Sequence, residues 1–82
     1  IELPGHLLTP GFVLMHEHLF YPLSFSPRGF AYTHIGSAFE SFPALYLAGG
    51  ATTIRTAGAV SPYADLNARE AVEAGRQPGP DM

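Results

Sequence analysis

The sequence contains no cysteine and few basic residues. The absence of cysteine excludes a disulfide framework and any thiolate site within these 82 residues. All four basic residues are arginines that stand apart from one another, so the sequence offers no basic patch for a nucleic acid. It also lacks an apolar run of about 18 residues, the length that a membrane-spanning helix requires. We therefore expect neither a nucleic acid nor a membrane as a partner, while the compartment and the oligomeric state stay undetermined.

The most informative motif is His16-Glu17-His18, at the end of an apolar run that begins at Phe12. In a β-strand, residues i and i+2 lie on the same side about 6–7 Å apart, so both imidazoles can reach one metal ion. The near-continuous hydrophobicity favours a parallel strand, whose C-terminal end is where α/β proteins place their chemistry. The alternation predicts that Leu14 is buried on the face of the histidines, and that Glu17 points the other way in a structural role. Two histidines without any ligand are the alternative interpretation.

The residues around this motif resemble a known family. Residues 9–19, followed by residues 47–58, are similar to the amidohydrolase superfamily of metal-dependent hydrolases, and more closely to its imidazolonepropionase-like and prolidase-like branch. In that family the first motif is barrel strand 1, and the second is helix 1 running into strand 2. Glu17 departs from the pattern, because much of the family carries Thr, Ser or Asn between the histidines, whereas His-Glu-His-Leu also occurs in phosphotriesterase-like relatives. Thr56 departs too, at a position where Asp commonly follows the Arg.

The resemblance implies a (β/α)8 barrel, which takes about 250 residues, whereas the chain has 82. We therefore expect an α/β fold that is a partial TIM barrel, consisting of the first βαβ unit plus a helix and preceded by the edge of a small β-sandwich. Residues 1–8, with a short strand and a Pro-Gly turn, would end the sandwich segment, and residues 9–82 would form the N-terminal portion of the barrel. Neither Ile1 nor the loop ending at Met82 resembles a natural terminus. We interpret the chain as the N-terminal third of a larger enzyme. The remainder of that enzyme would be the partner that these residues pack against.

Capping and turn residues outline the elements that follow the first strand. The expected elements are a helix that opens at Ser37 and ends at Gly49-Gly50, a β-branched strand over 51–55 and a helix over 65–74 introduced by Ser61-Pro62. Pro43 removes a backbone donor, so the first helix can become regular as late as residues 42–43. Arg55, near the end of a buried strand, needs an anionic or carbonyl partner, because a lone buried charge is costly. We expect an ion pair inside the barrel, with substrate binding as the alternative.

A loop of about 17 residues, 20–36, follows the histidines and is rich in aromatic side chains. Loops of this length after a strand are often lids or binding loops. We expect most of its aromatics to pack the loop onto the barrel rim. Tyr21 is the candidate for substrate contact, because a hydroxyl near a metal can polarise an electrophile. His6 and His34 are expected to be turn or rim residues and not metal ligands.

The predicted chemistry combines the two histidines with what the resemblance implies. Two neutral imidazoles suit a divalent metal, and zinc is the metal we expect first, as one or two ions. Such a metal lowers the pKa of a bound water toward about 7. In relatives the other ligands and the aspartate base come from later strands, so residues 1–82 would contain no complete catalytic set and would be inactive alone. The sequence thus predicts part of a metal-dependent hydrolase in which His16 and His18 are the ligands that activate a water nucleophile. The substrate would be a small molecule with a carbon–nitrogen bond, as in a non-peptide or dipeptide amide.

Two alternatives stay open. One is a non-catalytic metal-binding or structural βαβ module. The other is a phosphotriesterase-like hydrolase, which the order His-Glu-His-Leu allows. The sequence that follows Met82 is the observation that would separate these interpretations.

Overall fold

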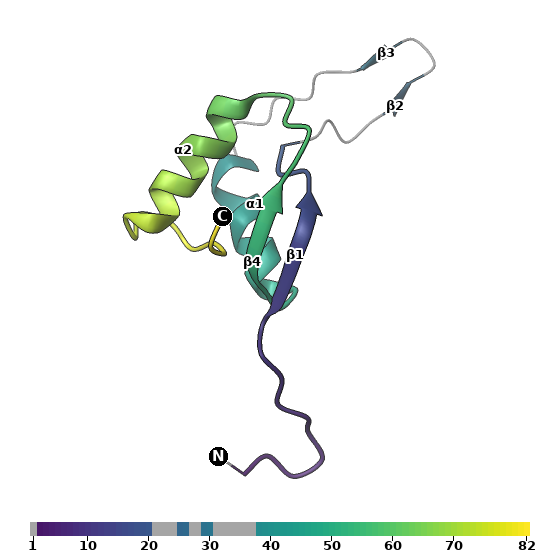
Figure 1. The fold of residues 1–82 in the computed structure, drawn as a ribbon, viewed down its shortest axis with the longest axis vertical. Coiled ribbons are helices and arrows are strands. Elements are labelled where there is room, and N and C mark those ends of the chain that lie inside the picture. The colour runs from purple at the N-terminus through teal and green to yellow at the C-terminus, as the bar shows by residue number, and fades with distance from the viewer. Residues whose placement is uncertain (1, 21–24, 27–28, 31–37) are drawn as a thin grey trace.

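The computed structural model of this protein describes residues 2–20, 25–26, 29–30 and 38–82. Its elements in chain order are β1 (Phe12–Glu17), β2 (Phe25–Ser26), β3 (Gly29–Phe30), α1 (Ala38–Ala48), β4 (Ala51–Thr56) and α2 (Pro62–Glu73). β1 and β4 are parallel neighbours connected through α1, while β2 and β3 form a separate short antiparallel pair (Figure 1). The described part of the chain is therefore a small α/β fold, and the predicted βαβ unit is confirmed.

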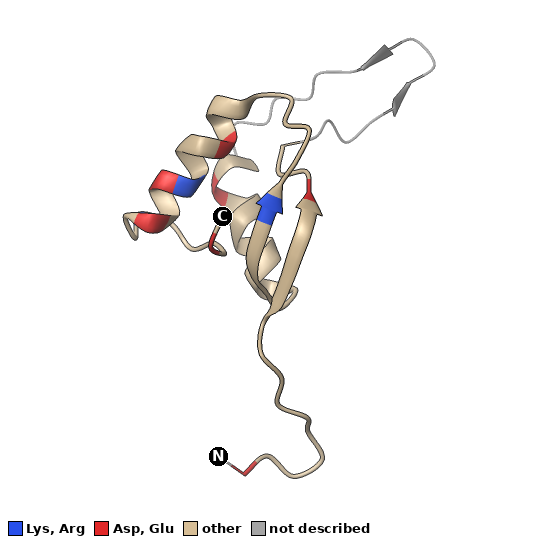
Figure 2. Cartoon of the chain, viewed as in Figure 1, with Lys and Arg blue, Asp and Glu red and all other residues tan. Residues whose placement is uncertain are grey.

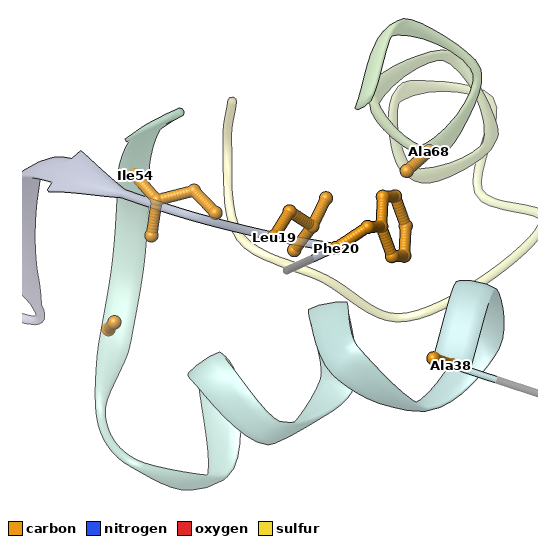
Figure 3. Close-up of a cluster of buried hydrophobic side chains, with 6 residues drawn as sticks. Leu19, Phe20, Ala38, Ile54 and Ala68 are labelled. Carbon is orange, nitrogen blue, oxygen red and sulfur yellow. The ribbon is translucent and has the colours of Figure 1, made fainter. Parts of the chain in front are cut away.

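The hydrophobic core lies between β4, the two helices and the two residues that follow the histidines. Leu19 and Phe20 enter it directly after β1, Ile54 enters it from β4, and Ala38 and Ala68 enter it from α1 and α2 (Figure 3). These side chains are all less than a tenth exposed. Burial of this apolar surface holds both helices against the same side of the β1–β4 sheet.

The opposite side of the sheet has no covering layer among the described residues, and we call it the uncovered face. It carries Val13 and Met15 of β1, which are 58% and 62% exposed. Arg55 of β4 is also exposed, and β4 carries a basic position near its end in Figure 2. Arg55 makes no ion pair within the described part of the chain. The exposed guanidinium keeps its water and needs no carboxylate here, and the ion pair predicted for Arg55 inside a complete barrel stays a prediction.

The pairing of β1 with β4 is irregular between Leu14 and Glu17. Leu14 pairs with Ile54 and Glu17 pairs with Thr56, so three steps along β1 match two steps along β4. As a result, Leu14 and Glu17 are both half-buried, while the residues between them are exposed. The prediction that Leu14 lies buried on the face of the histidines is wrong, because one extra residue in a strand reverses the alternation that follows it.

The segment before β1 contains no strand over residues 2–11, so the short strand predicted within residues 1–8 is absent from its described part. A turn at Pro4 and Gly5, with Gly5 at φ 76°, is the feature that the sequence did predict. Leu7 and Leu8 are 88% and 76% exposed. A strand must pair its backbone groups with a neighbour, and no described strand lies beside this segment, which projects away from the sheet in Figure 1.

Both helices agree closely with the prediction. α1 is one continuous helix with Pro43 buried inside it, so the later start at 42–43 is not observed. It ends at Ala48, and Gly50 in the turn that follows has a φ of 87°, in the left-handed region that glycine tolerates. α2 begins at Pro62 with Ser61 at its N-cap, three residues before the predicted start. None of the described helices is long and apolar enough to cross a membrane.

The last residues of the chain extend the sheet beyond β4. Asp81 donates its backbone N–H to the carbonyl of Thr52 at 2.9 Å, and its own carbonyl accepts from Ile54 N–H at 2.8 Å. The bridge between Thr53 and Asp81 is parallel. β4 therefore has parallel neighbours on both edges, whereas β1 is the edge strand of this sheet as far as the described residues show.

Candidate metal centre

The two histidine rings of the motif lie side by side at the C-terminal end of β1. His16 is the penultimate residue of the strand and His18 follows its last residue. Their ring centroids are 5.1 Å apart, and the ring planes meet at 85°. Both side chains are exposed, and residues 15–19 are not helical. The prediction that the two rings lie on one side of an extended segment is confirmed.

The orientation of His18 is set by the residue that follows β4. The ring atom Nδ1 lies 2.6 Å from the backbone carbonyl oxygen of Ala57. A carbonyl oxygen only accepts, so Nδ1 is the donor in this contact, and in the neutral ring Nε2 is the nitrogen without a proton. Metal-binding histidines in proteins almost always donate their other N–H to such a partner. The geometry of His18 therefore suits a metal ligand.

The residue between the histidines is anchored to the helix layer. The hydroxyl of Tyr46, in α1, donates to Oε2 of Glu17 at 3.0 Å. The predicted orientation of Glu17, away from the histidines and in a hydrogen-bonded structural role, is confirmed. Burial and the hydrogen bond to Glu17 raise the pKa of Tyr46 to about 12. The phenol therefore stays protonated and remains a donor at neutral pH.

The residues after the histidines fasten this end of the strand to the core. Leu19 is 2% exposed and Phe20 is 5% exposed. The ring of Phe20 stacks on Phe39 and Phe42 of α1, with centroid distances of 5.9 Å and 6.2 Å. The expected packing role of Phe20 is confirmed. Side chains 17, 19 and 20 thus hold the segment to the helices.

Sequence reasoning did not identify Tyr46, Ala57 or Asp65 as parts of this region. Tyr46 was expected only on the apolar stripe of its helix, and a backbone carbonyl such as that of Ala57 leaves no signal in a sequence. Asp65, in the first turn of α2, is only 8% exposed, and its Oδ2 has no hydrogen-bond partner. Its negative charge also helps to raise the pKa of Tyr46. Acidic residues are common in first helical turns, so its sequence position gave no reason to expect burial.

The other predicted residues do not join the pair. Tyr21, His34 and Ser37 lie outside the described residues. His6 is an exposed turn residue whose Nδ1 lies 3.1 Å from the carbonyl of Pro4, as expected. Within the described ranges, no group of three or more His, Cys, Asp or Glu side chains is arranged to hold a metal. The two imidazoles fit a divalent metal as two of its ligands, and the remaining ligands would have to come from elsewhere.

The chain was compared with known protein families, curated proteins and solved structures. No protein-family model, curated protein or solved structure matches this chain.

Proposed function

We propose that this chain forms the first strands of a metal-dependent hydrolase barrel in which His16 and His18 hold a divalent metal, zinc first. The observation that carries the proposal is the pair of adjacent imidazoles at the C-terminal end of a parallel strand, with the ring of His18 oriented by Ala57. Parallel α/β proteins place their active sites at this end of their strands. The substrate class, a small molecule with a carbon–nitrogen bond, comes from the resemblance to amidohydrolases.

The partial barrel is supported by the sheet itself. Strands of a (β/α)8 barrel are all parallel and are buried on both faces. Here β1, β4 and the bridge at Asp81 run parallel, and both helices cover one side of the sheet. The uncovered face then presents Val13 and Met15, which suit a barrel interior filled by further strands. The open edge of β1 suits the last strand of a closed barrel.

The residues of this chain would divide the work at such a site. His16 and His18 would each offer a ring nitrogen, and Ala57 would hold the ring of His18 in the tautomer that a metal requires. A bound metal would supply a water whose pKa is lowered toward about 7. Leu19 and Phe20, buried in the core, would keep the histidines at a constant distance from the second strand. The general base and the remaining ligands would come from residues outside this set.

The test uses the full-length natural chain that contains these residues. Its metal content is measured by mass spectrometry, and hydrolysis is assayed on a dipeptide, a lactam and a phosphotriester. His16→Asn and His18→Asn should each lose the metal and lower hydrolysis by more than about 100-fold, the upper end of the losses seen when only an outer partner of a ligand is removed. His6→Asn, which changes an exposed histidine in a turn, is the matched control and should keep both properties.

Each alternative outcome identifies a different function. Hydrolysis of the phosphotriester alone would replace the amide substrate with the phosphotriesterase-like class that the Glu17 motif allows. Stoichiometric metal without hydrolysis of any substrate would favour the non-catalytic metal-binding module. A wild-type protein that binds no divalent metal would overturn the proposal.

A further inference from the structure

We propose that Tyr46 is a positioning residue for the two histidines and acts on them through Glu17. The inference deepens the proposed function and rests on it, because it concerns how the same site is held in shape. Its basis is the hydrogen bond from the Tyr46 hydroxyl to Oε2 of Glu17, at 3.0 Å. Glu17 is the one residue that lies between the two histidines in the chain, so its side chain controls the backbone that carries both of them.

The backbone that leads into Glu17 is paired irregularly with β4. The register of β1 against β4 is irregular between Leu14 and Glu17, immediately before and within the motif. The regular ladder resumes with Glu17 opposite Thr56, and the Glu17 carbonyl accepts from Ala57 N–H at 2.8 Å. Side-chain anchoring therefore matters more here than in the middle of a regular strand. The bond from Tyr46 ties Glu17 to α1, across the core from the exposed rings.

Because side chains alternate along a strand, the fixed position of Glu17 also sets the directions of the two histidine side chains. When Glu17 is fixed toward the helix layer, the residues on either side of it must point to the opposite side of the segment. Their rings lie there, 5.1 Å apart. Loss of the bond would leave a half-buried carboxylate without this donor, and the carboxylate would gain by turning toward water. That rotation would twist the two peptide units that set the directions of His16 and His18.

The surroundings keep Tyr46 in the role of donor. Its pKa is raised to about 12 by burial, by the bond to Glu17 and by the nearby charges of Glu17 and Asp65. The phenol has one proton to donate, and that proton goes to Glu17, whereas Oδ2 of Asp65 has no hydrogen-bond partner. The anchor therefore persists throughout the pH range in which a hydrolase of this kind would work.

The experiment measures Co²⁺ binding to the metal-free full-length chain, with Co²⁺ as a spectroscopic substitute for zinc. Tyr46→Phe removes only the hydroxyl. It should weaken Co²⁺ binding by about 10-fold or more, within the range for changes to outer partners of metal ligands, and should change the intensity of the visible Co²⁺ absorption. Tyr63→Phe removes a hydroxyl from a side chain that is 78% exposed on α2. This matched control should leave affinity and spectrum unchanged.

Variants of Glu17 test whether Tyr46 acts through it. Glu17→Ala removes the acceptor and should weaken Co²⁺ binding as much as Tyr46→Phe does, whereas Glu17→Gln keeps a carbonyl oxygen for the phenol and should retain most of the affinity. The double variant Tyr46→Phe with Glu17→Ala should bind no more weakly than either single variant, because both changes break one bond. These variants also keep the test decisive if Tyr46→Phe fails to fold.

The failures of the two proposals are distinguishable. If wild-type protein binds Co²⁺ and Tyr46→Phe binds it with the same affinity and spectrum, or if the losses in the double variant add, the positioning role is refuted and the metal site stands. If Tyr46→Phe lowers the resistance to urea without changing the Co²⁺ affinity of the folded protein, the role of Tyr46 is purely structural. That result would also refute the positioning role. If wild-type protein binds no Co²⁺, the metal site and the inference fall together.

Discussion

The stretch of five residues from His16 to Phe20 has two sides that differ in every property relevant to function. On one side Leu19 and Phe20 are almost completely buried, and Glu17 is hydrogen-bonded to a helix. On the other side the two imidazoles are exposed and adjacent. The buried side supplies rigidity, and the exposed side supplies ring nitrogens that a ligand can reach. The difference shows how a short segment can be fixed by some of its side chains while it exposes others: Glu17 alternates with the two histidines, and Leu19 and Phe20 enter the core after the strand has ended.

The same contrast holds for the whole sheet. The covered side packs against α1 and α2, and its side chains form the core. The uncovered face leaves Val13 and Met15 in contact with solvent as far as the described residues go. Large apolar side chains gathered on one face usually mark a surface that another element covers. Under the proposed barrel, that element is the set of later strands.

The largest expected effect comes from the buried side of the motif. Phe20→Ala should lower the free energy of unfolding by about 3–5 kcal/mol, because it removes a ring stacked between Phe39 and Phe42 and leaves a cavity. Urea unfolding followed by circular dichroism measures this loss. The comparison variant, His16→Ala on the exposed side, should stay within about 0.5 kcal/mol of wild type in the metal-free protein. Similar losses in both variants would show that the two sides do not differ in stability.

The next effect tests whether the uncovered face is covered in the longer chain that the proposed barrel requires. Met15→Ala should destabilise that protein by about 2 kcal/mol or more, the lower end of the range for a buried methionine, if later strands pack on this face. The measurement is again urea unfolding of the metal-free protein. A change below about 0.5 kcal/mol is the value expected at a surface position. That result would mean that Met15 stays in solvent and would contradict the barrel.

The smallest effect concerns the pH dependence of the Tyr46 anchor. The folded state raises the pKa of Tyr46 from 10.0 to about 12, so folding favours the neutral phenol. The stability from this group is therefore fully present below pH 10 and is lost as the pH rises from 10 toward 12. Urea unfolding between pH 9 and pH 12 should show this decline in wild type, and the decline should be smaller in Tyr46→Phe. Parallel curves for the two proteins would contradict the assigned pKa.

Several elements could be predicted from local sequence because their causes are local. The glycines after α1 and the Ser-Pro pair before α2 mark helix boundaries through backbone preferences that need no distant partner. The alternation within the His-Glu-His motif likewise predicted that the two rings lie together and that Glu17 points away. The strand expected within residues 1–8 failed, because the described residues offer it no neighbour for pairing.

The sequence by itself determined the α/β class, the positions of β1, α1, β4 and α2 within a few residues, and the pairing of the two histidine rings. Only the tertiary structure decided that α1 supplies Tyr46 to Glu17 and that Ala57 orients His18. These contacts join residues that are 29 and 39 positions apart in the chain. Sequence periodicity relates only residues a few positions apart, so it does not predict contacts of this kind. The irregular register of β1 is also a tertiary outcome. It arises where two strands must match each other, whereas a pattern read along one strand assumes that the match is perfect.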